Sequence, residues 1–246
     1  MNKAAVFFAL AVFAILCFAG PASAQTPVVV ELFTSEGCSS CPPADAILVK
    51  LSRMSTDGDA QLILLGEHVD YWNYLGWTDR FSSAQFSQRQ SEYGRALHSQ
   101  VYTPQMVIDG KTEFVGNDLS EVNRTIAAAA NDPKPAQVAL RWEANNRLHV
   151  IVQSPAQSAT TVLLATTEDG LSTSVANGEN GGSVLHHAAV VRQLRELGRA
   201  DKGKFETTVD FAPQADWNKA NLKLAVLVQE AGDMKILGAA EVTYAH

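Results

Sequence analysis

The fold expected of this chain is decided by one segment, Glu31-Leu-Phe-Thr-Ser-Glu-Gly-Cys-Ser-Ser-Cys-Pro-Pro-Ala-Asp45. An apolar run over residues 28–33 predicts a strand, and the residues from Ala44 onward are compatible with a helix. Cys38 and Cys41 lie in the turn between them. At a helix start, two cysteines at this spacing face the same way and are close enough to form a disulfide. The free amide groups and the dipole of the helix end also stabilise a thiolate.

The two cysteines are expected to have different roles. Cys38 is placed at or just before the first helical turn, where partial exposure and a lowered pKa would make it the reactive thiol. Cys41 is placed one turn into the helix and would resolve the mixed disulfide that Cys38 forms. Pro42 and Pro43 fit the first turn, where a missing N–H costs little. A bridge between residues so close closes a very small loop and adds little stability, so its expected use is redox chemistry.

Residues 25–131 are predicted to form an α/β domain with a mixed central sheet and the order β-α-β-α-β-β-α. The Asp109-Gly110 pair between two apolar runs is a strong hairpin signal, and Asp118 or Ser120 can cap the last helix. The expected strands cover residues 28–33, 61–66, 105–108 and 112–115, and the expected helices cover residues 41–54, 83–99 and a segment that runs through residue 130.

This order resembles the thioredoxin fold, and a second motif agrees with it. Pro104 directly precedes the third strand, where thioredoxin-like proteins place a cis-proline that faces the two cysteines. A cis bond before proline is uncommon enough to be retained for a reason. The resemblance implies that the backbone of Thr103 pairs with an incoming peptide beside Cys38. A lone Cys-x-x-Cys is also half of a zinc site, and a lone Thr-Pro is an ordinary strand entry, but the two together in this order favour the redox fold.

Several further motifs resemble a bacterial family of secreted thioredoxin-like proteins catalogued as domain of unknown function 1223. The resemblance extends over most of the mature chain. The motifs that carry it are residues 33–45, 68–72, 75–77, 102–105, 178–180 and 187–192. Gly37 stands where the standard thioredoxin motif has tryptophan, and Ser39-Ser40 replaces Gly-Pro. The dipeptide between the cysteines helps to set the redox potential, so oxidation, reduction and isomerisation all stay open. Glu36 would disfavour a Cys38 thiolate.

The second half of the chain has a different pattern. Residues 132–135 read as a short, stiff linker, and residues 136–246 are expected to form an all-β, antiparallel sandwich-like domain. The glycine-rich segment 177–182 is expected to be a loop, and it lacks the lysine of a phosphate loop. The expected strands are residues 138–142, 148–152, 161–166, 184–194, 204–211, 222–229 and 236–243.

The N-terminus predicts export. Residues 1–24 combine Lys3, an uncharged apolar run and a small-residue cleavage site, as in a secretory signal peptide cut after Ala24. The apolar run is short against the roughly 20 residues of a membrane span, which argues against an uncleaved anchor. The mature protein is therefore predicted to be periplasmic or secreted, where a disulfide can persist. A net charge of −7 gives no basic surface and excludes nucleic acid and anionic membranes as expected partners.

Polar and aromatic residues follow the second expected strand, at the sheet edge where ligands of open α/β sheets gather. His68 and Asp70 are candidates for proton transfer to or from Cys41, and Trp72 and Trp77 are candidates for an apolar wall of the substrate groove. For His68 and Trp72 an ordinary core role stays equally open. For Trp77 the core role is favoured.

The function predicted is thiol–disulfide exchange on protein thiols or disulfides, with catalytic Cys38 and Cys41, substrate binding at Thr103, Pro104 and Trp72, and no dissociable cofactor. A membrane electron donor or acceptor is a further candidate partner. Two alternatives stay open: a copper or zinc binder that uses the same cysteines, and a non-catalytic periplasmic binding module with a structural disulfide.

These alternatives need different structures. His186 and His187 adjoin in one strand and point to opposite faces, so no metal ligands are assigned. A metal binder needs a histidine nitrogen within reach of both sulfurs. An oxidoreductase needs an accessible Cys38 and a cis Pro104, and a binding module tolerates a buried, inert disulfide.

Overall fold

A computed structural model describes residues 25–54, 56–58, 60–154, 159–200 and 203–244. The signal peptide predicted at residues 1–24 lies outside the described residues. The helices are α1 (Pro42–Ser52), α2 (Ala84–Ala96), α3 (Leu119–Ala130) and the short 3-10 helix η1 (Lys219–Asn221). The strands are β1 (Thr26–Thr34), β2 (Thr56–Asp57), β3 (Ala60–His68), β4 (Gln105–Ile108), β5 (Thr112–Val115), β6 (Gln137–Glu143), β7 (Arg147–Gln153), β8 (Thr160–Glu168), β9 (Leu171–Ser174), β10 (Val184–His187), β11 (Val190–Arg199), β12 (Lys204–Asp210), β13 (Leu222–Glu230) and β14 (Ile236–Thr243).

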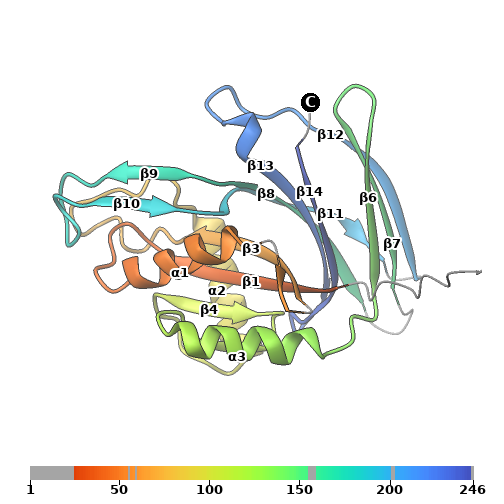
Figure 1. The fold of residues 1–246 in the computed structure, drawn as a ribbon, viewed down its shortest axis with the longest axis horizontal. Coiled ribbons are helices and arrows are strands. Elements are labelled where there is room, and N and C mark those ends of the chain that lie inside the picture. Colours follow the sequence, from red (N-terminus) through yellow and green to blue (C-terminus); the bar gives the residue numbers. More distant parts are fainter. Residues whose placement is uncertain (1–24, 55, 59, 155–158, 201–202, 245–246) are drawn as a thin grey trace, which may run out of the picture.

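One large mixed sheet contains strands from both halves of the chain (Figure 1). Its order is β14-β13-β8-β11-β3-β1-β4-β5, and β2 pairs with β3 outside this path. β1 and β3 are parallel, and the halves meet where Val190 of β11 pairs with Gly66 of β3. The amide of Gly66 donates to the carbonyl of Ala189 at 2.7 Å. Smaller sheets are formed by β10-β9 and by β12-β7-β6.

The predicted fold class is wrong. In a compact thioredoxin-like domain followed by a separate β-sandwich, β3 would lie at the edge of the first sheet. An edge strand has free backbone N–H and C=O groups, and a strand from elsewhere in the chain can pair with them. Here β11 takes that place, and β8, β13 and β14 continue the sheet beyond it. The domain limits 25–131 and 136–246 stay a prediction, and strands from both sides of the expected linker hydrogen-bond within this one sheet.

The individual elements agree with the sequence-based expectations better than the fold class does. β4 and β5 coincide with the expected strands, and Asp109 and Gly110 both have positive φ angles, 52° and 64°, as the hairpin signal requires. A Cβ atom at Gly110 would lie 2.1 Å from the carbonyl oxygen of Met234, so glycine lets this turn pack against the second half. The expected strand 184–194 is broken into β10 and β11 at Ala189, whose φ is 49°.

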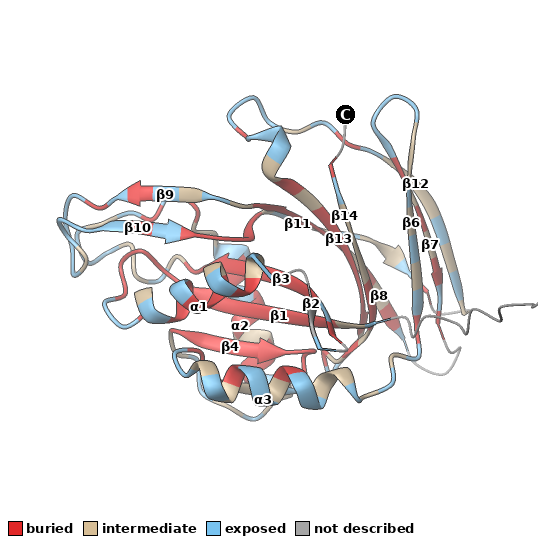
Figure 2. Cartoon of the chain, viewed as in Figure 1, coloured by how far each residue is buried: buried red, intermediate tan, exposed pale blue. Residues whose placement is uncertain are grey.

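Alternating side chains of β1 explain the layers. Val28, Val30 and Leu32 pack into one core cluster with residues of α1 and α3, and Val29 packs into another with Phe86 of α2 and residues of β8, β11, β13 and β14. A further cluster lies between the β12-β7-β6 sheet and the strands β8 and β13. Figure 2 shows the buried strands at the centre, with exposed residues on the outer faces of the helices and on the long hairpins. Among the described residues, no helix is long and apolar enough to cross a membrane.

Candidate functional site

The two cysteines form a disulfide in the turn that connects β1 to α1. The Cα atoms of Cys38 and Cys41 are 5.4 Å apart. The amide of Cys38 donates to the carbonyl of Ser35 at 3.2 Å, and the amide of Cys41 donates to the carbonyl of Cys38 at 3.2 Å, so two successive turns lead into the helix. Cys41 is the N-cap residue and Pro42 is the first residue of α1. Cys41 therefore lies before the helix, and not one turn inside it as expected.

Both cysteines are buried. The relative exposure of Cys38 and of Cys41 is 0%, whereas Ser39 and Ser40 between them are exposed. The partial exposure expected of Cys38 is therefore absent in this conformation. A thiolate from another molecule can reach the sulfur only after neighbouring groups have moved.

Thr103 and Trp72 lie against the Cys38 side of the disulfide. The Thr103 hydroxyl donates to the Cys38 Sγ at 3.3 Å and accepts from the indole N–H of Trp72 at 2.8 Å. The Ser40 hydroxyl donates to the carbonyl of Thr103 at 3.4 Å, and the Thr103–Pro104 peptide bond is cis. A Cβ atom at Gly37 would lie 3.2 Å from the Cβ of Trp72, so the close approach of this tryptophan explains a glycine before Cys38. The structure thus brings together the predicted substrate-binding residues and Cys38.

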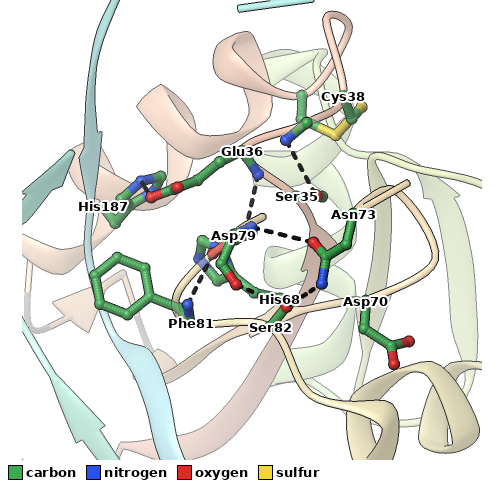
Figure 3. A network of polar contacts seen from close by, with 12 residues as sticks. Ser35, Glu36, Cys38, His68, Asp70, Asn73, Asp79, Phe81, Ser82 and His187 are labelled. Atoms are coloured by element: carbon green, nitrogen blue, oxygen red, sulfur yellow. Dashed lines mark hydrogen bonds and ion pairs between the residues drawn. A yellow bond between two sulfur atoms is a disulfide. The ribbon is translucent and has the colours of Figure 1, made fainter. Parts of the chain in front are cut away.

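Beneath the turn lies a set of buried ionisable side chains, which we call the acid–histidine cluster: Glu36, His68, Asp79 and His187 (Figure 3). His68 Nδ1 is 2.6 Å from Asp79 Oδ2, and the same oxygen accepts from the backbone amide of Glu36 at 2.9 Å. His187 Nε2 lies 3.3 Å from Glu36 Oε1, and the indole N–H of Trp77 donates to Glu36 Oε2 at 2.8 Å. The rings of His68 and His187 are 4.9 Å apart. The cluster therefore holds both the backbone and the side chain of Glu36, two residues before Cys38.

The pKa values of two carboxyl groups in the cluster are lowered. Burial and the charge of Asp79 work to raise the pKa of Glu36, but the contacts with His187, Thr173 and Trp77 outweigh them and leave this pKa lowered. The same balance holds for Asp79, where burial is outweighed by the charge and hydrogen bond of His68 and by two backbone amides. Burial works to lower the pKa of His68, but the charge of Asp79 outweighs it and leaves the pKa raised. Both shifts favour the charged forms of His68 and Asp79, whose Nδ1 and Oδ2 atoms lie 2.6 Å apart.

Asp45 brings a further buried carboxyl group to this region from α1. Burial raises its pKa, and the charges of His187 and His68 only partly oppose this. Its Oδ2 atom is buried and has no hydrogen-bond partner among the residues that the structure describes. The pKa of Asp45 is therefore shifted in the opposite direction to those of Glu36 and Asp79.

The two residues predicted to transfer protons lie in different places. His68 is buried in the acid–histidine cluster and is bonded to Asp79. Asp70 is turned away from the cysteines, as Figure 3 shows, and its Oδ1 atom accepts from the hydroxyl of Ser87 of α2 at 2.5 Å. No group of three or more histidine, cysteine, aspartate or glutamate residues in the described part of the chain is arranged to hold a metal ion.

Residues of the second half contact the disulfide turn from outside. The side-chain amide of Asn180 donates to the carbonyls of Glu36 and Cys38, both at 2.9 Å. The carboxylate of Glu179 accepts from the amide of Ser39 at 3.0 Å. The turn is therefore held by the cluster beneath it and by the β9–β10 connection above it.

The family model described as "Protein of unknown function (DUF1223)" matches residues 29–229. This chain belongs to the DUF1223 family. The match extends from β1 of the first half to β13 of the second, so it contains the disulfide turn, the acid–histidine cluster and the β9–β10 connection.

A crystal structure of a protein from Agrobacterium tumefaciens is similar to this DUF1223 protein over nearly its whole length. The two are 28% identical, with a TM-score of 0.75, and the match covers 90% of this chain and 96% of that chain. None of the curated proteins matches.

Two other solved structures match only part of the DUF1223 protein. A domain of the outer membrane lipoprotein Omp28 from Porphyromonas gingivalis is 12% identical, with a TM-score of 0.27, over 45% of this chain and 88% of that chain. OgpA from Akkermansia muciniphila is 12% identical, with a TM-score of 0.28, over 46% of this chain and 30% of that chain. These TM-scores are too low for any inference about fold or function.

Sequence reasoning missed part of the site of this DUF1223 protein. Asp79 is not among the predicted site residues, although an acid next to the aromatic residues Trp77 and Phe81 needs a partner once that stretch is buried. Trp77 was assigned to the core, yet it is only half-buried and binds Glu36. In the sequence, Glu179 and Asn180 are noticed only as part of a motif that resembles the family, without a role at the site. No local signal connects them to Cys38, from which they are separated by more than 100 residues.

Proposed function

We propose that this DUF1223 protein carries out thiol–disulfide exchange with protein thiols or disulfides through Cys38 and Cys41. The observation that supports this most is the contact of Cys38 Sγ with the Thr103 hydroxyl, directly above a cluster of buried ionisable groups. Perturbed ionisable groups gather at functional sites, although structural ion pairs perturb pKa values as well. A disulfide across residues three apart adds little stability by closing its loop, so a structural role alone does not account for these surroundings.

The proposed reaction is an exchange of one disulfide for another. A thiolate of a protein dithiol attacks Cys38 Sγ, the bond between Cys38 and Cys41 breaks, and Cys41 leaves as a thiolate that takes up a proton. The second thiol of the partner loses its proton and attacks the partner sulfur that is bonded to Cys38. This releases Cys38 as a thiolate and leaves the partner with a disulfide. The reverse sequence reduces a protein disulfide. Both directions conserve electrons between the two sulfur pairs, and the reduction potential decides which one operates.

Burial of the disulfide supports a second candidate. With both cysteines at 0% exposure, the pair also fits a structural bridge in a non-catalytic binding module. Buried structural cysteines are inert, so reactivity separates the two candidates. We place either function outside the cytoplasm, in the periplasm or beyond the cell, on the basis of the signal-like residues 1–24.

The exchange is tested with the purified protein and a model protein that contains one dithiol, which is used reduced with wild type and as its disulfide with the cysteine variants. In Cys41→Ser the Cys38 thiolate attacks the disulfide of the oxidised model protein, and the mixed disulfide is expected to accumulate because the resolving thiol is missing. The Cys38→Ser variant is expected to form none. Mass spectrometry detects the adduct. Wild type equilibrated in glutathione buffers then gives the potential: a value near about −270 mV indicates a reductant and one near about −120 mV an oxidant.

A wild-type pair that exchanges with neither glutathione nor the model dithiol would reject this proposal and leave the structural bridge. If Cys38→Ser traps the partner and Cys41→Ser does not, the roles assigned to the two cysteines are reversed. Both variants remove one sulfur of the same bridge, so each is the stability control of the other.

A further inference from the structure

The β9–β10 hairpin is built differently from the rest of the second half. It forms a two-stranded sheet of its own, without strand pairing to the main sheet. Its base is buried through His187, Leu185 and Thr173, while most of the connection between the strands is exposed. Figure 1 shows the hairpin reaching out over the start of α1, and Figure 2 shows its exposed end. An anchored base and an exposed tip are the features of a segment that can move as a unit.

The tip is bonded to the backbone of the disulfide turn at three points. We call residues 175–183, which connect the two strands, the latch loop. Asn180 donates to the carbonyls of Glu36 and Cys38, and Glu179 accepts from the amide of Ser39. A Cβ atom at Gly178 would lie 3.1 Å from the Cβ of Trp77, so the loop also lies close against the half-buried indole that binds Glu36.

These contacts bear on how the sulfur can be reached. The Cys38 backbone cannot shift outward without breaking the bond from Asn180 to its carbonyl. The neighbouring groups on either side, the Glu36 carbonyl and the Ser39 amide, are tied to the same loop. The conformation in which both sulfurs are buried is therefore the one in which the latch loop is closed.

We propose that the latch loop controls access to the Cys38–Cys41 disulfide, and that Asn180 is the positioning residue that holds the turn in its buried conformation. The inference rests on the proposed exchange at Cys38 and adds a step to it: the loop releases the turn before a thiolate attacks. A partner protein that displaces Asn180 from the two carbonyls would expose Cys38 only in the complex. Small thiols would then react slowly with the free protein.

The test measures reduction by a water-soluble trialkylphosphine, which breaks the S–S bond, takes oxygen from water and leaves two thiols. Free thiols are counted over time in wild type, Asn180→Ala and Asn180→Asp. Loss of two hydrogen bonds to the turn is expected to accelerate reduction about tenfold in Asn180→Ala. Asn180→Asp should react at least as fast, because a carboxylate of the same shape cannot donate and repels both carbonyl oxygens.

Two further variants make the result specific. Asn177→Ala changes an exposed residue of the same loop. In the described part of the chain, the side-chain bonds from this loop to the turn come from Glu179 and Asn180, so the rate of Asn177→Ala should match that of wild type. Glu179→Ala removes a single exposed contact and should give a smaller acceleration, about threefold. Hydrogen exchange at the Ser39 amide should increase in Glu179→Ala and in both Asn180 variants.

Rates equal to wild type in both Asn180 variants, with unchanged circular dichroism, would overturn the latch. So would an equal acceleration in Asn177→Ala, because the effect would then come from general loosening of the loop. If the Asn180 variants do not fold, Glu179→Ala decides, and a wild-type rate there rejects the inference. One outcome separates the two proposals. If the Asn180 variants are reduced faster by the phosphine but wild type does not exchange with the model dithiol protein, the latch stands and the proposed function is rejected.

Discussion

Two buried polar clusters join the halves of this molecule, and they use similar chemistry for different ends. One is the acid–histidine cluster beneath the disulfide turn. The other, which we call the arginine cluster, lies between α2 and the main sheet and consists of Glu31, Glu67, Arg89, Tyr93 and Gln229. Arg89 Nε donates to Glu31 at 2.7 Å, and Arg89 Nη1 donates to Gln229 of β13 at 2.9 Å. Each cluster thus ties β1 or its following turn to residues of the second half.

The pKa values of their carboxyl groups shift in opposite directions. Two carboxyl groups share one guanidinium in the arginine cluster, and burial raises the pKa of Glu67 well above its usual range. In the acid–histidine cluster, the pKa values of Glu36 and Asp79 are lowered instead. The charged oxygens there also bind a backbone amide of the disulfide turn. The comparison teaches that one cluster fixes strands and a helix, while the other fixes the loop that carries the cysteines.

The largest effect is expected from Arg89→Met, which breaks the arginine cluster. Removal of one partner from a buried ion pair leaves uncompensated charge and should lower the free energy of unfolding by about 3–5 kcal/mol. The rate of phosphine reduction of the folded variant should stay at the wild-type value, because the bonds of Arg89 within the described residues go to Glu31, Glu67, Tyr93 and Gln229 and not to the disulfide turn. Denaturant unfolding and thiol counting measure the two quantities. Arg95→Met, an exposed change on the same helix, is the control and should alter neither. A changed reduction rate in Arg89→Met would erase the distinction between the clusters.

Asp79→Asn should come next, with a loss of about 2–4 kcal/mol in the free energy of unfolding, because it leaves His68 without its charged partner. Unlike Arg89→Met, it should also accelerate phosphine reduction, since the Glu36 amide loses a carboxylate acceptor. Asp210→Asn, at an exposed position, is the matched control and should behave as wild type. A destabilised Asp79→Asn with an unchanged reduction rate would show that the acid–histidine cluster is merely structural.

The same variant should flatten the pH dependence of stability. The pKa of Asp79 is lowered in the folded state, so its contribution is present above its ordinary pKa of about 3.9 and is lost as the pH falls through the folded value. The pKa of His68 is raised, so its contribution is present below about 6.5 and is lost as the pH rises through the folded value. The stabilisation from this pair is therefore greatest between those limits. Unfolding curves from pH 2 to 9 should show both losses in wild type and smaller losses in Asp79→Asn, because Glu36 still titrates at the acid end and Asp45 and Glu36 still favour a charged His68.

The smallest effect is expected from Trp77→Phe, which removes the hydrogen bond to Glu36 Oε2 and keeps most of the ring surface. The loss should be about 1–2 kcal/mol, because a buried acceptor is left without its donor. The pKa of Glu36 should rise, since one of the contacts that lower it is gone. Trp142→Phe removes an indole bond to Thr243 in the second half and is the matched control. Only Trp77→Phe should change the rate of reduction, and equal rates in the two variants would show that Glu36 does not influence the turn.

Local patterns in the sequence determined most of the elements but not their assembly. Asp109-Gly110 predicted a tight hairpin because few other pairs accept two positive φ angles, and the apolar run before Cys38 predicted β1. The pairing of β11 with β3 was not predictable, because it depends on a single residue pair, Val190 with Gly66, and on a break at Ala189. Nothing local distinguishes a strand that closes a second domain from one that extends the first sheet.

The candidate site divides along the same line. The sequence by itself determined that Cys38 and Cys41 can form a disulfide at the start of a helix, because their spacing and Pro42 are local properties of the chain. Only the tertiary structure decided that the disulfide is buried and held by Asp79 and Asn180. Those contacts arise where the two halves pack together, and neither residue follows a pattern that refers to the cysteines. The physical reason is that hydrogen-bond partners are selected by proximity in the folded chain, whereas sequence patterns record only the preferences of neighbouring residues.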